Sequence, residues 1–380
     1  MSELNYLEKL LDGTEVEWKA LGDVTSVLRG KRLTKNLLSA EEKFPVFHGG
    51  LEPLGYYNKS NRPANTVMII NVGASAGTVG YSTVDFWSSD GCFCLEHNEL
   101  LNNRFLYFAL IGYQSLLKSK VRVAGIPTLD AIVVNKLLIP IPCPENPEKS
   151  LAIQSAIVRI LDKFTALTAE LTAELTARKK QYNYYRDQLL SFEDGEVEWK
   201  SLGEVAIITI GEFVRKDKQN PDADYPVYNG GRTPTGYYED FNNDGDKIIV
   251  SARGANAGFV NKSSTPYWAG NSCYSISVRS TEQLHWMYVY YYLKQSETKL
   301  TGIQQKGGIP AVSKKQMEDL LLPIPSKSEQ VRIVTILDKF DTLTSSITEG
   351  LPREIELRQK QYEYYRDLLF SFPRPETASN

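Results

Sequence analysis

The residue types that most often bind metals or attack substrates are sparse in this sequence. Cys92, Cys94 and His97 form the group spaced most closely to suggest metal ligands. The matching stretch later in the chain keeps Cys273 but has a serine and a valine at the other two positions. Because residues at i and i+2 share one face of a strand, packed core cysteines are the simpler interpretation. We therefore expect no metal site, and four cysteines are too few for a disulfide framework in 380 residues.

Motifs that bind nucleotides or hold an extruded base are missing from the sequence. It has no Asn/Asp-Pro-Pro-Tyr/Phe segment, no G-x-x-x-x-G-K-[ST] phosphate loop and no G-x-G-x-x-G opening a helix after a strand. Its three histidines are scattered and unpaired. The sequence thus predicts a chain that is not itself an enzyme and that carries no cofactor.

Two basic stretches are better candidates for function. They comprise Arg29, Lys31, Arg32 and Lys35 in the first half of the chain and Arg215, Lys216 and Lys218 in the second. Each follows the first predicted strand of its domain, in a loop that contains glycine. Such clusters are often only solvated surface. Here the net charge of the chain is −3, so any contact with nucleic-acid phosphates must depend on local clusters of this kind.

Polar side chains also occur at turns that contain glycine. Residues 44–47 and 225–228 each look like an aromatic strand entering a tight turn. The turn tips differ between the two places, with His48, Leu51 and Glu52 at one and Asn229, Arg232 and Thr233 at the other. The aromatic flanks are either core residues or part of the same surface. Residues 73–77 and 254–258 are glycine loops that are either plain hairpins or further contacts.

The remaining candidates precede a Gly-Ile-Pro turn that also occurs twice, at residues 125–127 and 308–310. Glutamine is a good bidentate partner for adenine, and arginine for guanine. Beyond the two basic stretches, the candidate contacts to DNA are His48, Ser75, Lys118, Lys120, Arg122, Asn229, Arg232, Arg253, Asn256, Lys299, Gln304, Gln305 and Lys306.

These features occur in pairs because the chain repeats itself after about 181 residues. Val16-Glu17-Trp18-Lys19 returns at residues 197–200. The segment Ile-Leu-Asp-Lys-Phe at residues 160–164 returns unchanged at 336–340, and residues 178–192 return nearly unchanged at 358–372. Each repeat is therefore a variable globular part followed by a nearly fixed helical part.

The globular parts are predicted to be mainly β. They consist of short β-branched and aromatic runs separated by Gly, Asn, Asp and Pro. Residues 102–118 and 282–299 each have the pattern of a single helix.

The fixed parts have the pattern of a coiled coil. No Pro or Gly interrupts the chain between Pro147 and Phe192. From Ile157 onwards a stripe alternates steps of four and three residues, and all its members are apolar or tyrosine except Thr168 and Arg178. The second copy begins the same way at residues 333, 337, 340, 344, 347 and 351 but holds four more residues before its Arg-x-Lys-Gln-Tyr segment. Four extra residues are a stutter in a heptad pattern, and the stutter falls at Gly350-Leu351-Pro352. We expect the helix to break there.

Connectivity predicts the arrangement of these elements. If the two apolar stripes pair, the helices run antiparallel, and the two domains are related by a pseudo-two-fold axis, as symmetric DNA readers are. The predicted class is α+β, with two mainly-β recognition domains separated by two long antiparallel coiled-coil helices. The predicted boundaries are 1–146 for the first domain, 147–192 for the central helix, 193–326 for the second domain, 327–373 for the last helix and 374–380 for a tail.

The whole chain resembles the specificity subunit of type I restriction-modification systems. The resemblance rests on the repeated Ile-Leu-Asp-Lys-Phe and Arg-x-Lys-Gln-Tyr-x-Tyr-Tyr-Arg-Asp blocks, the Ile-Pro-Ile-Pro exits, and the tandem Thr-Ala-Glu-Leu units at 168–175. It implies two target-recognition domains, each of which reads half of a split DNA site, and helices that set the spacing. It also implies two modification subunits that methylate adenine with S-adenosylmethionine, together with restriction and translocase subunits.

Two repeated side chains lie outside the apolar stripe of each helix. They are Tyr184 and Arg186 in the first copy and Tyr364 and Arg366 in the second. A second helical face that repeats is best explained by a repeated partner, so we interpret it as the binding face for one modification subunit per copy.

Composition excludes some classes of protein and leaves two alternatives open. No apolar run approaches the ~20 residues that span a bilayer, and Met1 to Leu11 lacks the order of a signal peptide, so we expect a cytoplasmic protein without membrane contact. One alternative is an assembly scaffold whose β domains bind protein or glycan. The other is an orphan DNA-binding protein without enzymatic partners. A scaffold would show no salt-dependent affinity for DNA, whereas a reader of DNA loses affinity steeply as salt rises.

Overall fold

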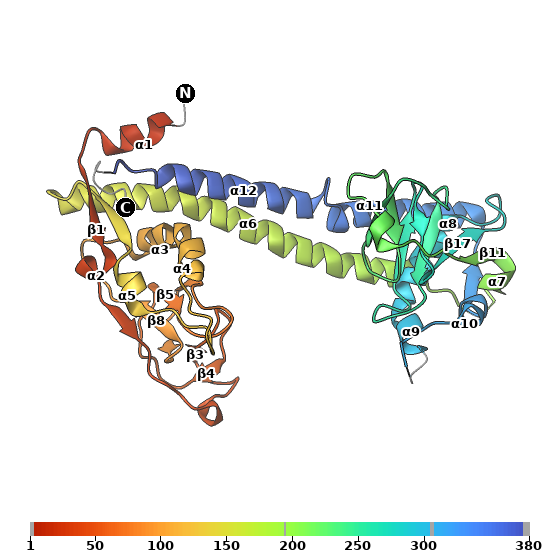
Figure 1. The fold of residues 1–380 in the computed structure, drawn as a ribbon, viewed down its shortest axis with the longest axis horizontal. Coiled ribbons are helices and arrows are strands. Elements are labelled where there is room, and N and C mark those ends of the chain that lie inside the picture. The colour runs from red at the N-terminus through yellow and green to blue at the C-terminus, as the bar shows by residue number, and fades with distance from the viewer. Residues whose placement is uncertain (1–3, 194, 305–307, 375–380) are drawn as a thin grey trace. The chain divides into compact units, whose positions relative to one another are not determined.

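The computed structural model describes residues 4–193, 195–304 and 308–374. The chain divides into two compact units, one made of Met1–Leu171 with Ile355–Asn380 and the other of Thr172–Glu354. Each unit contains one globular domain, called head 1 and head 2 below, and parts of the long helices (Figure 1). The mixture of short strands and helices in both confirms the predicted α+β class.

Head 1 is built from nine short strands and small helices. The helices are α1 (Leu4–Leu11), α2 (Leu21–Val24), α3 (Asn103–Gly112), α4 (Gln114–Ser119), α5 (Ala131–Asn135) and the 3-10 turn η1 (Lys35–Leu37). The strands are β1 (Val16–Ala20), β2 (Val27–Arg29), β3 (Phe44–Phe47), β4 (Gly55–Tyr57), β5 (Thr66–Ile70), β6 (Val79–Ser82), β7 (Trp87–Ser88), β8 (Cys92–Leu95) and β9 (Leu138–Pro142).

These strands form three small sheets. A four-stranded sheet has the order β2-β8-β5-β6, a three-stranded sheet has the order β4-β3-β7, and β1 pairs with β9. In the last pair Trp18 lies opposite Pro140, so the first and last strands of the head close on each other. The basic stretch at residues 29–35 therefore follows the second strand of the head, and the prediction that it follows the first was wrong.

Head 2 repeats this plan with the same order of elements, except that it has no helix corresponding to α1. Its helices are α7 (Leu202–Val205), η2 (Lys216–Lys218), α8 (Trp286–Gln295), α9 (Glu297–Gly302) and α10 (Lys314–Glu318). Its strands are β10 (Glu198–Ser201), β11 (Ala206–Ile210), β12 (Tyr225–Tyr228), β13 (Gly236–Tyr238), β14 (Lys247–Ser251), β15 (Val260–Ser263), β16 (Trp268–Ala269), β17 (Cys273–Val278) and β18 (Leu321–Ile324). The sheets are β11-β17-β14-β15, β13-β12-β16 and β10-β18.

The single helix predicted in each head is wrong, because the structure has two. The break falls at Tyr113 between α3 and α4 and at Ser296 between α8 and α9, where ψ is −2° and 2°. Each second helix carries a fully buried leucine, Leu117 or Leu300. The backbone of α4 also passes within 2.8 Å of the position that a Cβ on Gly77 would occupy. This close packing of the second helix on a loop of the sheet outweighs the local helical pattern.

The fixed parts form α6 (Pro147–Leu189), α11 (Lys327–Ser345) and α12 (Leu351–Leu369). Along α6 the stripe residues Thr168, Leu171 and Leu175 are half-buried, while the residues between them are exposed. The heptad pattern thus marks the covered side of this helix, as the sequence predicts.

The stutter coincides with an interruption between Ser345 and Leu351. Gly350 adopts a φ of +81°, a left-handed conformation that disfavours other residues. Ile347, predicted to lie on the stripe, is instead mostly exposed, because the helix ends two residues before it.

Each unit holds one pair of antiparallel helices (Figure 1). In unit 1, Phe164 of α6 stacks on Tyr365 of α12 with ring centroids 5.2 Å apart. In unit 2, Phe340 of α11 stacks on Tyr185 of α6 at 5.8 Å. Phe164 corresponds to Phe340 in the repeat and Tyr185 to Tyr365, so each unit joins the beginning of one fixed part to the end of the other.

Replacing Gly350 by alanine should destabilise the protein. The added Cβ would lie 2.3 Å from the Thr342 carbonyl oxygen, and the residue would also be held at positive φ. We expect a loss of about 1–3 kcal/mol in the free energy of unfolding, measured by denaturant titration. The matched control is Gly302→Ala at the end of α9, where an added Cβ meets nothing within 4 Å. Equal stability of the two variants would contradict this account.

Candidate nucleic-acid interface

One edge of the four-stranded sheet gathers the candidate loops of head 1. Arg29 lies opposite Phe93, and Ile70 opposite Cys92, so β2 and β5 end where β8 begins. Loops 30–38 and 71–78 therefore leave the sheet on the same edge. Loop 48–54 also lies there, because the Ser89 amide beside β8 donates to the Phe47 carbonyl at 2.9 Å. These loops leave the sheet at one end of its strands, and we call that end of the sheet, with its loops, the loop edge of head 1.

Head 2 has a matching loop edge. Ile210 lies opposite Tyr274, and Ser251 opposite Cys273. The loops that gather there are 211–219, 229–235 and 252–259. Two of them are joined by a hydrogen bond of 3.2 Å from the Arg232 guanidinium to the Asn256 side-chain oxygen.

The Gly-Ile-Pro segment is tied to the same edge in both heads. The Gly73 amide donates to the Pro127 carbonyl, and the Gly254 amide donates to the Pro310 carbonyl, each at 2.9 Å. The glycine loops 73–77 and 254–258 connect antiparallel neighbours β5–β6 and β14–β15, so they are hairpins. In each hairpin the glycines have φ between 86° and 92°. The hairpins act as platforms on which the Gly-Ile-Pro segments rest.

The basic loops start from a fixed point. A Cβ on Gly30 would lie 2.1 Å from the Ser89 carbonyl oxygen, and a Cβ on Gly211 would lie 2.2 Å from the Ala269 carbonyl oxygen, so only glycine fits at either position. The Trp87 indole then donates to the Lys31 carbonyl at 2.8 Å, and the Trp268 indole donates to the Glu212 carbonyl at 2.9 Å. Both anchors are aromatic rings packed edge-on against a tyrosine on the opposite edge strand of the same three-stranded sheet.

The turn after the aromatic strand is longer than the tight turn predicted, spanning residues 48–54 and 229–235. His48 and Asn229 occupy its first position, and both are half-buried. His48 lies 3.4 Å from Asp90, whereas the Asn229 side-chain oxygen accepts from the Ser272 amide at 3.1 Å. These two residues thus attach the base of the loop to the neighbouring segment. The exposed residues at its tip are Leu51 and Glu52 in head 1 and Arg232 and Thr233 in head 2.

The structure places most of the predicted DNA contacts at the loop edges. In head 1 the exposed residues there include Arg29, Lys31, Arg32, Lys118, Lys120 and Arg122, while Ser75 is partly covered, and Lys35 lies in η1 beside Leu54 and Tyr56. In head 2 they include Arg215, Lys216, Lys218, Arg232 and Arg253, with Asn256 partly covered. Gln304 donates to the Ala257 carbonyl and so belongs to this edge, whereas Gln305 and Lys306 lie outside the described residues.

Ion pairs inside the loops reduce the charge available to a partner. Arg215 is paired with Asp217 at 2.5 Å, and its guanidinium lowers the pKa of that carboxyl. Arg122 is paired with Asp130 at 3.2 Å.

Two exposed apolar residues of head 2 also lie in the loop-edge region, at positions that a search for charged residues does not find. They become visible when the heads are aligned at Gly30 and Gly211. Ile210 and Phe213, both exposed, stand where head 1 has Arg29 and Arg32.

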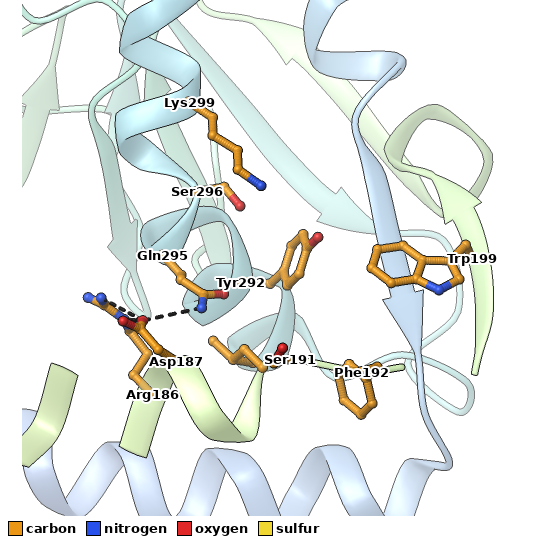
Figure 2. Close-up of a pocket in the computed structure, with 10 residues that line it drawn as sticks. Arg186, Asp187, Ser191, Phe192, Trp199, Tyr292, Gln295, Ser296 and Lys299 are labelled. Atoms are coloured by element: carbon orange, nitrogen blue, oxygen red, sulfur yellow. Dashed lines mark hydrogen bonds and ion pairs between the residues drawn. The ribbon is translucent and has the colours of Figure 1, made fainter. Parts of the chain in front are cut away.

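Lys299 does not join the loop edge. It lines a pocket of about 390 Å³ in unit 2 between the end of α6 and the α8–α9 junction, with Arg186, Asp187 and Tyr292 (Figure 2). In this pocket Asp187 accepts hydrogen bonds from Arg186 at 2.8 Å and from Gln295 at 3.2 Å. The prediction that Lys299 belongs with Gln304 was wrong, because Lys299 of α9 lines this pocket, whereas Gln304, beyond the end of α9, donates to the Ala257 carbonyl of the hairpin.

The predicted helical face separates into exposed tyrosines and covered arginines. Tyr184 and Tyr364 are 62% and 53% exposed. Arg186 and Arg366 are mostly covered and lie over the rings of Tyr182 and Tyr362, at 5.7 and 5.9 Å. Burial raises the pKa of both of these tyrosines to about 12, so they stay neutral. The same geometry therefore occurs in each unit, and its outward-facing part is aromatic.

The cysteines are core residues. Cys92 and Cys94 are fully buried on one face of β8 with Phe47, Met68 and Phe86. Burial raises the pKa of Cys273 to about 12, which keeps its thiol protonated. Across the described ranges, no group of three His, Cys, Asp or Glu side chains is placed to hold a metal ion.

The two heads and their matching loop edges define a duplicated protein with one candidate contact surface in each copy. Two segments, 14–178 and 195–357, match the type I restriction modification DNA specificity domain. The chain is 41% identical to the Escherichia coli EcoR124I/EcoR124II type I restriction enzyme specificity subunit, over 100% of both chains. It is 36% identical to the Escherichia coli EcoprrI specificity subunit, over 92% of this chain and 93% of that one. This chain belongs to the type I restriction modification DNA specificity family.

The fold agrees with that family. The S subunit of a type I restriction-modification system from M. genitalium matches with a TM-score of 0.70 at 20% identity, covering 96% of this chain and 98% of that one. The chain is accordingly a specificity subunit, the non-catalytic component of such a system. Within the residues that the structure describes, no helix has the length and apolar character to cross a membrane.

Removing either indole anchor should loosen one basic loop. In Trp87→Phe and Trp268→Phe the ring is kept but the hydrogen bond to Lys31 or Glu212 is lost. We expect the affinity for target DNA to fall about threefold to tenfold, corresponding to ~0.5–1.5 kcal/mol, with little change in the unfolding midpoint. Fluorescence anisotropy with the assembled complex measures the affinity. Trp199→Phe, away from the loop edge, is the control, and an equal loss in that variant would count against the anchoring role.

Proposed function

We propose that this chain reads a split, asymmetric DNA site, with one half-site contacted by each head. It directs the adenine methyltransferase subunits and the restriction subunits of a type I complex to that site. The complex works in the cytoplasm on double-stranded DNA. The specificity family of the chain supports this function, and the loop edges supply surfaces suited to it.

One observation carries the split-site proposal. The two heads share a backbone frame, held by the same glycines and indole hydrogen bonds, but present different side chains on it. Val72 of head 1 corresponds to Arg253 of head 2, and Arg32 corresponds to Phe213. Sequence is read by side chains at base edges, whereas phosphate contacts only position a protein. Heads that share a frame and differ in these side chains are suited to two different half-sites.

The repeated helical face is suited to two copies of one partner. Tyr184 and Tyr364 are exposed on corresponding turns, each packed edge-on against the next tyrosine at 5.4 Å. Aromatic side chains are enriched in protein interfaces because they combine a large apolar area with little loss of entropy. We assign this face, with Arg186 and Arg366 as its inner support, to two modification subunits.

Exchange of one head should change one half-site. We expect a chimera in which residues 1–145 come from the EcoprrI-type relative to methylate a site with one new half and one old half. The loop edge of head 1 lies entirely within residues 1–145, and the segments that complete its core belong to the nearly fixed parts of the repeat. Sequencing of methylated DNA from cells that carry the chimera measures the outcome. Exchange of residues 193–326 is the matched control and should change the other half. A chimera that alters both halves together would contradict the proposal.

The tandem Thr-Ala-Glu-Leu units within α6 are proposed to set the length of the unread spacer. One unit adds about 6 Å of helix and turns the remainder of the helix by roughly 40°, since four residues exceed one turn of 3.6. One base pair advances DNA by ~3.4 Å and rotates it by roughly 35°. The rotations nearly agree, so one added unit corresponds best to one added base pair.

A third Thr-Ala-Glu-Leu unit inserted after Leu175 should therefore lengthen the spacer by one base pair and leave both half-sites unchanged. Methylome sequencing of the insertion variant measures this directly. Insertion of a single alanine at the same point is the control, because it turns the remainder of the helix by about 100° and should abolish recognition. A spacer that stays the same with the third unit in place would exclude this helix as the ruler.

A further inference from the structure

Each head exposes the same isoleucine at the same point of its loop edge. Ile126 and Ile309, the central residues of the two Gly-Ile-Pro segments, are 71% and 76% exposed. Leaving a large apolar side chain in water forgoes the stabilisation gained by burial. A single exposed isoleucine needs no explanation, but the same one in both copies of a divergent domain does.

Hydrogen bonds within head 1 fix the loop that carries Ile126. In head 1 the Arg122 amide donates to the Thr128 carbonyl at 2.9 Å, and the Thr128 amide donates back at 3.0 Å. The Thr128 hydroxyl also donates to the carbonyl of Ile126 at 2.9 Å. With the bond from Gly73 to Pro127, these contacts fix both sides of the tip. The segment thus presents its side chain from a closed, hydrogen-bonded loop.

The surroundings of this residue vary between the heads, whereas the isoleucine does not. Lys118, on the helix before the segment, corresponds to Thr301, and Val72, on the hairpin beneath it, corresponds to Arg253. Side chains that read bases must differ between two different half-sites. A residue that stays the same at the centre of the loop edge serves something that both half-sites have in common.

We propose that Ile126 and Ile309 are apolar wedges that insert into the base stack of the bound DNA, one in each half-site. The proposal rests on the proposed function, in which each half-site carries an adenine that the partner subunit must methylate. Enzymes that modify a base extract it from the helix, and the cost is lower where stacking is already disturbed. Isoleucine is one of the side chains that proteins insert between base pairs, and an apolar wedge makes no hydrogen bond to a particular base.

The charges around the tip favour DNA over a protein as the occupant. In head 1 Lys118, Lys120 and Arg122 lead into the segment, and its basic loop leaves from the same sheet edge. An apolar side chain that follows a run of basic residues fits a ligand that has phosphates outside and apolar base faces inside. The exposed tyrosines of the long helices, by contrast, are the surface assigned to protein partners.

The test measures base unstacking in the full chain assembled with its modification subunits. Duplexes containing the target site carry 2-aminopurine, whose fluorescence rises on unstacking, at each position of one half-site in turn. We expect the unaltered complex to brighten the probe in both half-sites. Ile126→Ala should lose most of the signal in the half-site of head 1 only, and Ile309→Ala in that of head 2 only. Ile126→Leu should restore it.

Val123→Ala is the matched control, because Val123 is 80% exposed in the same segment and its counterpart, Lys306, is not apolar. It should leave the signal unchanged. The wedge proposal would be overturned if the complex with Ile126→Ala bound the site specifically and gave the same 2-aminopurine fluorescence as the unaltered complex. Failure of the alanine variants to assemble with the modification subunits on size exclusion would show a protein contact and also overturn it. An unaltered complex without site-specific binding would refute the proposed function itself, and the wedge with it.

Discussion

Neither head completes its hydrophobic core with its own globular residues. The core of head 1 includes Ile157 and Leu161 from α6, and also Leu369 and Phe372 at the far end of the chain. The core of head 2 likewise takes Ile333 and Leu337 from α11 and Leu190, the residue directly after α6. Each head is therefore finished by two helix segments that belong to different repeats. Burial of these apolar side chains, at about 1.5–3 kcal/mol each, couples the folding of every head to the long helices.

This coupling explains why the fixed parts of the sequence are fixed. Phe164 and Tyr365, or Phe340 and Tyr185, must meet face to face, so both members of each pair are constrained by the other repeat. The Trp18 indole, which donates to the Pro373 carbonyl at 2.7 Å, adds a polar contact of the same kind in unit 1. Exposed side chains at the loop edges need not match a residue of the other repeat, and they are the part of each head that varies.

Much of this arrangement can be predicted from the sequence, because heptad spacing and internal repetition are strong signals that survive without tertiary information. The stripe through Thr168 and Leu171 and the interruption at Gly350 are examples of that kind. Local pattern failed where tertiary contacts decide. It missed the bend at Tyr113, and it placed Lys299 with Gln304 although they are separated by the turn of a short helix. Charge alone also overlooked Ile210 and Phe213, which only the register of the repeat makes visible.

The anchors at the loop edge are made by backbone groups. The Trp87 indole donates to the Lys31 carbonyl, and the Gly73 amide donates to the Pro127 carbonyl. Gly30 has no side chain, so the backbone at Ser88 and Ser89 can pass close to it. Because a backbone carbonyl is the same whatever residue bears it, Lys31 and Glu212 accept the same bond from their tryptophans despite opposite charges. The frame can therefore stay constant while the side chains it carries are replaced. Under the proposed function, this separation lets each head carry its own set of DNA-contacting side chains on one fold. A net charge of −3 is compatible with that function, since only the loops have to be basic.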